Sequence, residues 1–112
     1  MKYKATAFTV RVSPPKLRQV ARVLRGRSAR DGRDLLRFIP RKPARMIEKV
    51  LRSAIANAEN NANVAEEHLL IDSVIIEEGV TMKRHIPAAK GSAHPIRKRT
   101  SHIRVILADR QV

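Results

Sequence analysis

The alternation of apolar and polar residues changes from a period of two to a helical period near residue 13. In residues 3–12 the period of two predicts a strand, with Thr6, Phe8, Val10 and Val12 on one face. The other face carries Ala5, Ala7, Thr9 and Arg11. We therefore expect residues 3–12 to form one β-strand at the start of the chain.

The predicted first helix follows directly. Ser13 is a good N-cap, and Pro14 suits the first helical turn, where its missing N–H is no loss. Apolar residues recur at helical spacing between Leu17 and Leu24, and Gly26 is expected to end the helix. One flank of this helix should pack against the rest of the protein, and the other flank should form a basic ridge. The cations on the circumference are Lys16, Arg18, Arg22 and Arg25.

Two more helices are predicted before residue 62. Ser28 and Asp31 have the spacing of a capping box, with Asp in the usual Glu position, and Pro40 should end the helix that they open. Pro43 fits the first turn of a third helix, which we expect to reach about Asn61. This helix should form the main part of the core. Its apolar stripe consists of Met46, Ile47, Val50, Leu51, Ala54, Ile55 and Ala58.

Branched residues predict two further strands, at residues 69–78 and 101–108. The connection between these two strands is long, and a structureless loop of such length is unusual in a compact domain. Residues 80–101 are therefore expected to form an extended hairpin with its tip near residues 87–92, projecting about 30 Å. Such a ribbon is marginal alone and should become ordered only against an anionic partner. The predicted fold is α+β: a single domain, residues 1–112, with a small three-stranded antiparallel sheet packed on three helices and a long protruding β-hairpin between the last two strands.

The net charge of +14 over 112 residues is strongly segregated. Residues 1–52 carry +13, residues 53–79 carry −6 without any Lys or Arg, and residues 80–112 carry +7. Basic faces of this size predict a polyanionic partner, most often a nucleic acid. The acidic block is interpreted as a solvated face, with a surface that meets a basic neighbour as the alternative.

Several function classes are excluded or disfavoured. Because the chain has no Cys, disulfide frameworks and thiol catalysis are excluded. No apolar run reaches the roughly 20 residues that cross a bilayer, and the start of the chain is no signal peptide, so we expect no membrane contact and a cytoplasmic location. The four His residues lack metal-ligand spacing, so no metal or other cofactor is expected. Ser101 and His102 are strand neighbours that face opposite sides, so no enzyme is expected.

The aromatic residues are only Tyr3, Phe8 and Phe38. Modules that read single-stranded bases by stacking need exposed aromatic side chains, so this mode is disfavoured. Contact with phosphates and with the shape of a folded nucleic acid is the mode that this composition favours.

Four segments of the sequence resemble a known family. They are VRVSPPKLRQVARVLRG, SAIANAENN, EEGVTMKRHIPAAKGSA and IRKRTSHIRVIL, in this order. The chain resembles the bacterial L-twenty-two protein family of the large ribosomal subunit over essentially its whole length. The resemblance implies a structural constituent that binds large-subunit ribosomal RNA, supports subunit assembly and contacts neighbouring ribosomal proteins. It also implies a hairpin tip that lines the nascent-peptide exit tunnel opposite another protein's loop, where the nascent polypeptide passes.

The resemblance also implies which residues face RNA. The family's SPRK turn falls at residues 13–16, with Pro15 in place of its arginine, and the family's basic stem falls on both arms of the hairpin. With the basic ridge of the first helix, the expected RNA-binding residues are Arg11, Ser13, Lys16, Arg18, Arg22, Arg25, Lys83, Arg84, Arg97, Lys98, Arg99, Thr100, Ser101 and His102. The expected tunnel tip is Pro87, Ala88, Ala89, Lys90, Gly91 and Ser92. Ala88 and Ser92 replace two family arginines, which leaves Lys90 as the cation of the tip.

The residues leave three alternatives open. The first is an architectural DNA-binding protein that uses the hairpin as a minor-groove arm. Such proteins usually act as dimers, whereas this sequence shows no apolar seam, and no homo-oligomer is expected. The second is a small enzyme with an RNA substrate, for which no acid–base or metal constellation is present. The third is a protein-binding module that uses the acidic block at residues 53–79.

Overall fold

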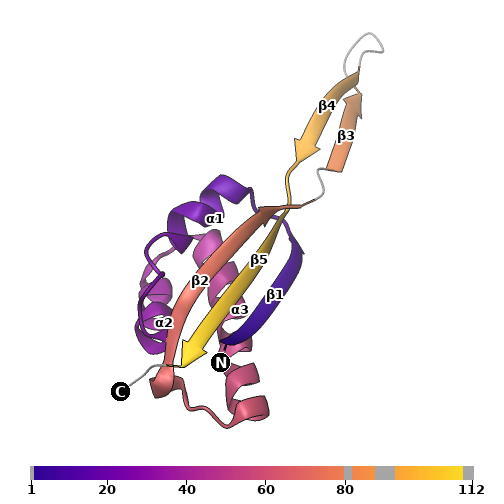
Figure 1. Cartoon of the computed structure of the whole chain (residues 1–112). Coiled ribbons are helices and arrows are strands. Elements are labelled where there is room, and N and C mark those ends of the chain that lie inside the picture. Colours follow the sequence, from indigo (N-terminus) through magenta and orange to yellow (C-terminus); the bar gives the residue numbers. More distant parts are fainter. Residues whose placement is uncertain (1, 80–81, 88–92, 110–112) are drawn as a thin grey trace.

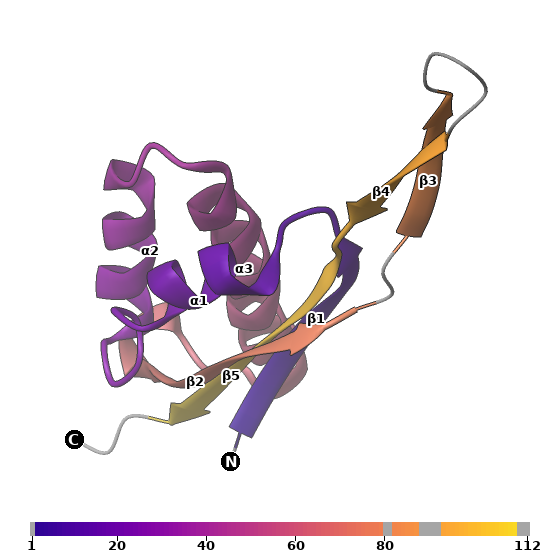
Figure 2. The same cartoon turned by 90° about the horizontal axis from the view of Figure 1, so that it is seen from above.

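The computed structural model describes residues 2–79, 82–87 and 93–109, with side chains described outside residues 80–98. Three helices cover one face of a three-stranded antiparallel sheet, and a two-stranded ribbon extends away from one end of it (Figures 1 and 2). The elements in chain order are β1 (Lys2–Val10), α1 (Pro14–Ala21), α2 (Ala29–Phe38), α3 (Lys42–Ala62), the short 3-10 helix η1 (Glu66–His68), β2 (Leu69–Glu78), β3 (Met82–Pro87), β4 (Ala93–Lys98) and β5 (Ser101–Asp109). The predicted α+β fold is confirmed.

Strand β5 lies at the centre of the sheet, in the order β1-β5-β2. Leu107 pairs with Tyr3 of β1 and with Ile71 of β2, and both pairings are antiparallel. Every second residue of β5 is buried, as the pleat requires, and these residues are Ser101, Ile103, Val105 and Leu107. The bounds predicted for β2 are confirmed, and β5 extends one residue beyond its predicted end.

Strand β1 ends earlier than the predicted strand, and the structure shows which of its two faces is packed. It ends at Val10, and Ala5 and Ala7 pack against the core, whereas Phe8 is 70% exposed. The pairing with β5 shifts between Ala7 and Val10, where Thr9 has a φ of 55°. This β-bulge returns Val10 to the core side, and an even alternation in the sequence contains no sign of it.

The start and end of the helices follow the predicted signals in part. The Ser28 hydroxyl accepts a hydrogen bond from the Asp31 N–H (3.2 Å), which confirms the cap of α2. Helix α1 ends at Ala21, earlier than predicted, because residues 22–27 form tighter turns. Gly26 adopts a φ of 81° in these turns and donates its N–H to the Ile71 carbonyl of β2 (2.9 Å). Gly26 therefore joins the turn to the sheet edge instead of ending the helix.

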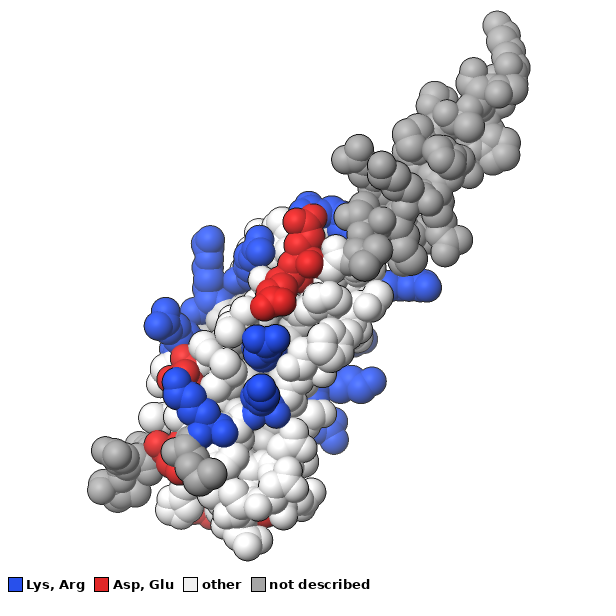
Figure 3. Space-filling view, turned by 45° about the vertical axis from the view of Figure 1, so that its right-hand side comes forward, with Lys and Arg blue, Asp and Glu red and all other residues white. Residues whose placement is uncertain are grey.

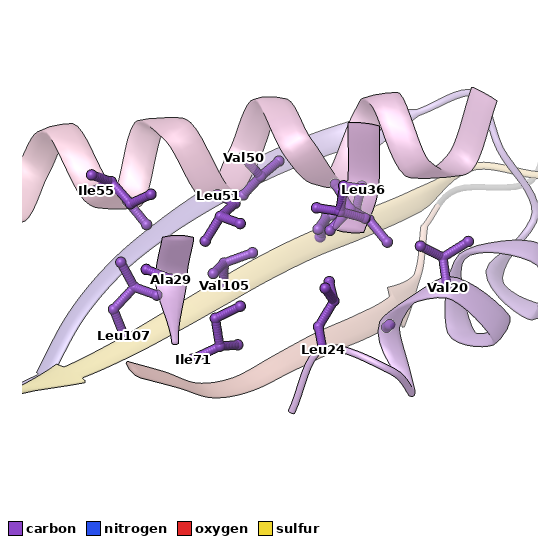
Figure 4. Close-up of a cluster of buried hydrophobic side chains, with 14 of the residues drawn as sticks. Val20, Leu24, Ala29, Leu36, Val50, Leu51, Ile55, Ile71, Val105 and Leu107 are labelled. Atoms are coloured by element: carbon purple, nitrogen blue, oxygen red, sulfur yellow. The ribbon is translucent and has the colours of Figure 1, made fainter. Parts of the chain in front are cut away.

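The core lies between the helices and the sheet, and α3 supplies most of its helical part. In Figure 4, Leu51 and Ile55 of α3 face Val105 and Leu107 of β5. The predicted apolar stripe of α3 is buried except for Met46, which packs at the edge of the core. Burying a Val, Leu or Ile side chain stabilises the fold by roughly 1.5–3 kcal/mol, so the apolar stripe fixes α3 across the sheet.

The ribbon between β2 and β5 is the predicted hairpin. Strands β3 and β4 pair from Met82 opposite Lys98 to Pro87 opposite Ala93, and the molecule measures 67 × 26 × 16 Å (Figure 1). The predicted tip residues Ala88, Ala89, Lys90, Gly91 and Ser92 lie outside the described residues. Within the described ranges, no helix combines the length and apolar character of a membrane span.

Candidate nucleic-acid interface

The root of the hairpin is tied to the loop that follows β1. The Ser101 hydroxyl donates a hydrogen bond to the Val12 carbonyl oxygen (2.6 Å), and the Gly79 N–H donates to the Thr100 carbonyl oxygen (2.9 Å). The side chains of Thr100 and Ser101 are fully buried. The direct RNA contacts expected of these two side chains therefore give way to a structural role inside the chain, in which they hold the root in place.

A basic cleft of about 550 Å³ opens beside this root. Three separate parts of the chain build it: the β1–α1 loop with the first turn of α1, the first turn of α3, and Arg99 between β4 and β5. Among the described residues, no Asp or Glu lines it. Its lining consists of Arg11, Val12, Ser13, Lys16, Lys42, Pro43 and Arg99. Four cations thus face a concave surface, which is an arrangement that attracts phosphate groups.

Two helices begin at the basic cleft. Neither α1 nor α3 has an acidic residue in its first turn, so the positive ends of both helix dipoles add to the charge of the side chains. The Ser13 hydroxyl makes no capping hydrogen bond to the described first turn of α1, and Ser13 is only partly buried. This hydroxyl can therefore donate to an anion in the basic cleft.

A second basic surface, the ridge of α1, runs along α1 and the turns that follow it. Arg18, Arg22 and Arg25 are exposed and border a groove of about 600 Å³ between α1 and the edge of β2. The Arg18 Nη2 atom donates to the Ile76 carbonyl oxygen of β2 (3.3 Å), which fixes one guanidinium of the ridge against the sheet. The structure thus collects the predicted residues of the body into two groups, the basic cleft and the ridge of α1.

The predicted stem residues of the hairpin are placed by their backbone alone. Lys83 lies opposite Arg97, Met82 lies opposite Lys98, and Arg84 pairs with Ile96. The backbone register therefore brings cationic positions of the two arms to the same level of the ribbon.

His102 has partners within the chain. Its Nδ1 atom accepts a hydrogen bond from the Thr9 N–H (3.0 Å), and its ring meets the Phe8 ring at 67° with centroids 5.3 Å apart. The expected RNA-binding role of His102 thus coexists with a contact that fixes the β1 bulge. Phe8 is a residue that sequence reasoning missed, because the period of two does not show which face of β1 the helices cover.

Lys42 and Pro43 are cleft residues that sequence reasoning also missed. They stand 31 positions and more from Arg11 in the sequence, and only the packing of α3 against β1 brings them to the same cleft. Their one signal was local: the start of a helix whose first turn holds a cation and no acid.

The acidic block pairs largely with the chain's own cations. Four of its six acids form ion pairs: Asp72 with Lys2 (3.3 Å), Glu66 with Arg33 (3.3 Å), Glu78 with Arg99 (3.7 Å) and Glu77 with Arg104 (4.0 Å). Figure 3 shows acidic side chains gathered near the hairpin root, with Lys and Arg side chains around them. The interpretation as a simply solvated face is therefore incomplete, since the block also orders cations around it.

Comparisons with known proteins agree with the geometry. The sequence profile of the family described as ribosomal protein L22p/L17e matches residues 5–108. The large ribosomal subunit protein uL22 of Pediococcus pentosaceus is 49% identical over 108 residues, covering 96% of this chain and 92% of that protein. The protein of the same name from Akkermansia muciniphila is 48% identical over 111 residues, covering 99% of each. The chain therefore belongs to the ribosomal protein L22p/L17e family, and it is a ribosomal protein rather than an enzyme.

Proposed function

We propose that this chain is a structural constituent of the large ribosomal subunit in the cytoplasm and binds the RNA of that subunit. The observation that carries the proposal is the basic cleft, where Arg11, Lys16, Lys42 and Arg99 face a common space beside two helix N-termini. These four cations come from parts of the chain that only the fold brings together. Their convergence supports binding of a phosphate backbone rather than general solubility.

Binding in the basic cleft proceeds by replacement of counterions. Each Lys or Arg that meets a phosphate releases condensed cations from the RNA, so the affinity falls as salt rises. The Ser13 hydroxyl and the two helix N-termini add hydrogen-bond donors that fix the position of the phosphate. Thr100 and Ser101 act one step removed from RNA, because they hold the root that carries Arg99.

The hairpin extends the proposed RNA contact away from the body. Lys83, Arg84, Arg97 and Lys98 are proposed to neutralise phosphates on both sides of the ribbon, in support of subunit assembly. The tip, from Pro87 to Ser92, is proposed to help line the nascent-peptide exit tunnel beside neighbouring ribosomal proteins. The family membership and the 67 Å length of the molecule support this proposal.

A salt titration with large-subunit RNA tests the proposal. About eight phosphate contacts predict a log–log slope of about −6, at about 0.7 per contact. The Lys16→Ala/Lys42→Ala variant should lower the steepness by about 1.4. The control Lys4→Ala/Arg30→Ala removes the same charge from exposed positions outside the basic cleft and the ridge, and should leave the slope near that of the unmodified chain.

Equal slopes for the two double variants would contradict a specific role of the basic cleft. Competition with duplex DNA at fixed salt distinguishes the proposed function from that of an architectural DNA-binding protein. Duplex DNA should displace large-subunit RNA poorly if the proposed function is correct. Sedimentation of the tagged chain with the large subunit in high salt tests the assembly itself. A chain that leaves the subunit at moderate salt would contradict a structural role.

A further inference from the structure

The structure exposes aromatic side chains that the sequence alone does not distinguish from core residues. Phe8 is 70% exposed and Phe38 is 85% exposed, so two of the three aromatic side chains of the chain face solvent. The sequence disfavoured base stacking because that mode needs exposed aromatic side chains and the chain has only three aromatic residues. Two of the three meet this need, so base stacking returns as a mode of recognition.

The Phe8 ring is held in its exposed position by its neighbours. Thr9 adopts a φ of 55°, which is an outlier for a β-branched residue. The Thr9 N–H donates to His102 Nδ1 (3.0 Å), and the His102 ring contacts Phe8 in a T-shaped geometry with a centroid distance of 5.3 Å. The contact with one ring orients Phe8 while most of its surface stays open to solvent.

Phe8 also stands beside the basic cleft. It lines an aromatic groove of about 430 Å³ between β1 and α3, and Arg11 and Lys42 line both this groove and the basic cleft. Lys49 adds a third cation to the groove, and none of the described residues that line it is acidic. An exposed ring and a basic surface are therefore contiguous, which is the combination with which proteins bind single-stranded nucleic acids.

We infer that Phe8 stacks on an unpaired nucleobase whose neighbouring phosphate is bound by Arg11 and Lys42. The inference rests on the proposed function, because it assumes that RNA enters the basic cleft. It adds a contact that depends on the base to contacts that depend on charge alone. Phe38 serves as a comparison, since it is more exposed but lines neither the basic cleft nor the aromatic groove.

A single tryptophan can report the stack, because the chain contains none. The full-length Phe8→Trp variant is titrated with oligoadenylate of about ten nucleotides, within the site sizes of single-strand binders. A second titration uses an abasic ribose-phosphate chain of equal length. Oligoadenylate should quench and shift the tryptophan emission, whereas the abasic chain should bind without this change. The Phe38→Trp variant, treated in the same way, should respond equally weakly to both.

A Phe8→Leu variant measures what the ring contributes, because leucine keeps the apolar character but lacks the aromatic face. Its affinity for oligoadenylate should fall about 5-fold to 100-fold, and its affinity for the abasic chain should not change. Phe38→Leu should change neither affinity. A thermal melt of each variant checks that the fold is retained, and the emission of Phe8→Trp gives a reading that does not depend on the leucine variant.

The outcomes separate this inference from the proposed function. Equal affinity of Phe8→Leu and the unmodified chain for oligoadenylate, with binding intact, would overturn stacking and leave RNA binding in place. If Phe8→Leu no longer sedimented with the large subunit but kept its affinity for the oligonucleotides, Phe8 would contact a protein instead of a base. This result would also overturn stacking. Failure of the unmodified chain to bind either oligonucleotide or large-subunit RNA would remove the proposed function and the inference together.

Discussion

The Ser101 hydroxyl donates a 2.6 Å hydrogen bond to the carbonyl oxygen of Val12, 89 residues away in the sequence. Both residues are buried at the root of the hairpin. Val12 lies between Arg11 and Ser13, and Ser101 follows the segment that carries Arg99, so this one bond joins two sides of the basic cleft. The position of the cleft cations therefore depends on a buried hydrogen bond within the chain.

Replacement of Ser101 tests this dependence. Ser101→Ala removes the donor and leaves the Val12 carbonyl without it in a buried position, so the free energy of unfolding should fall by about 1–3 kcal/mol. Urea unfolding measures the change. Ser53→Ala is the control, since the exposed Ser53 hydroxyl donates to the Lys49 carbonyl within α3 (3.2 Å) and its loss should change stability by no more than about 0.5 kcal/mol. Similar losses in both variants would show that the Ser101 bond has no special weight.

Gly79 allows the two arms of the root to approach each other closely. A Cβ atom at this position would lie 2.6 Å from Thr100 Oγ1 and 3.2 Å from the Thr100 carbonyl carbon. Gly79→Ala should therefore lower the free energy of unfolding by about 1–3 kcal/mol through overpacking. Urea unfolding should also show a smaller cost of Gly79→Ala in a Thr100→Ala background, because the closest contact, to Thr100 Oγ1, is then absent.

A second glycine provides the control for this experiment. Gly26→Ala meets no atom within 4 Å, but it strains a backbone whose φ is 81°. Its cost of about 1–2 kcal/mol should be the same with and without Thr100→Ala, since the two sites do not touch. A background effect of equal size at both glycines would exclude the close approach as the cause.

The fold was largely predictable because its signals are local. Ser28 and Asp31 cap α2, the apolar stripe of α3 is continuous, and the branched residues of β2 mark both ends of that strand. The β1 bulge at Thr9 was not predictable, because the hydrogen bond that accompanies it joins Thr9 to His102, which lies 93 positions away. A period of two in the sequence describes a regular strand and cannot show where a distant partner interrupts it.

The candidate site was predictable in its charges and less so in its geometry. Arg11, Lys16 and Arg99 were expected from charge and resemblance, and the structure gathers them in the basic cleft. Lys42 joins them only through the packing of α3 on β1. Charge counts place cations along the chain, whereas the tertiary fold decides which of them face the same space.

Tyr3 links the first strand to the end of β5 and makes stability sensitive to high pH. Desolvation by burial, followed by the hydrogen bond that the phenol donates to the Asp109 carboxylate, raises the pKa of Tyr3 above its usual value of 10.0. Above pH 10.0 the unfolded chain loses this proton while the folded chain still holds it. The contribution of Tyr3 to the free energy of unfolding is therefore fully present below pH 10.0 and is lost as the pH rises further.

Tyr3→Phe removes the titrating group and provides the comparison. Urea unfolding of this variant should show a weaker decline of stability above pH 10.0 than the unmodified chain. The two profiles should run parallel near neutral pH, where Tyr3 is protonated in both states. An equally steep alkaline decline in both proteins would mean that lysines, and not Tyr3, carry the pH dependence.

Glu78 lies at the root of the hairpin and forms an ion pair with Arg99 of the basic cleft, so it should compete with the RNA that we propose binds there. Its Oε1 atom is 3.7 Å from Arg99 Nη2, and both side chains are about half exposed. Glu78→Gln frees the guanidinium for phosphate, so the affinity for large-subunit RNA should rise about 1.4-fold to fivefold at low salt, since exposed ion pairs are worth about 0.2–1 kcal/mol. The gain should shrink as salt screens the pair.

Glu77→Gln is the matched control for this gain. It removes the same charge from the neighbouring residue, whose Oε1 atom lies 4.0 Å from Arg104 Nη1, and Arg104 does not line the basic cleft. If net charge alone governed binding, filter-binding titrations would give the two variants the same increase. A larger increase for Glu78→Gln assigns the effect to Arg99, because only this substitution releases a cation that already faces the space where the phosphate binds.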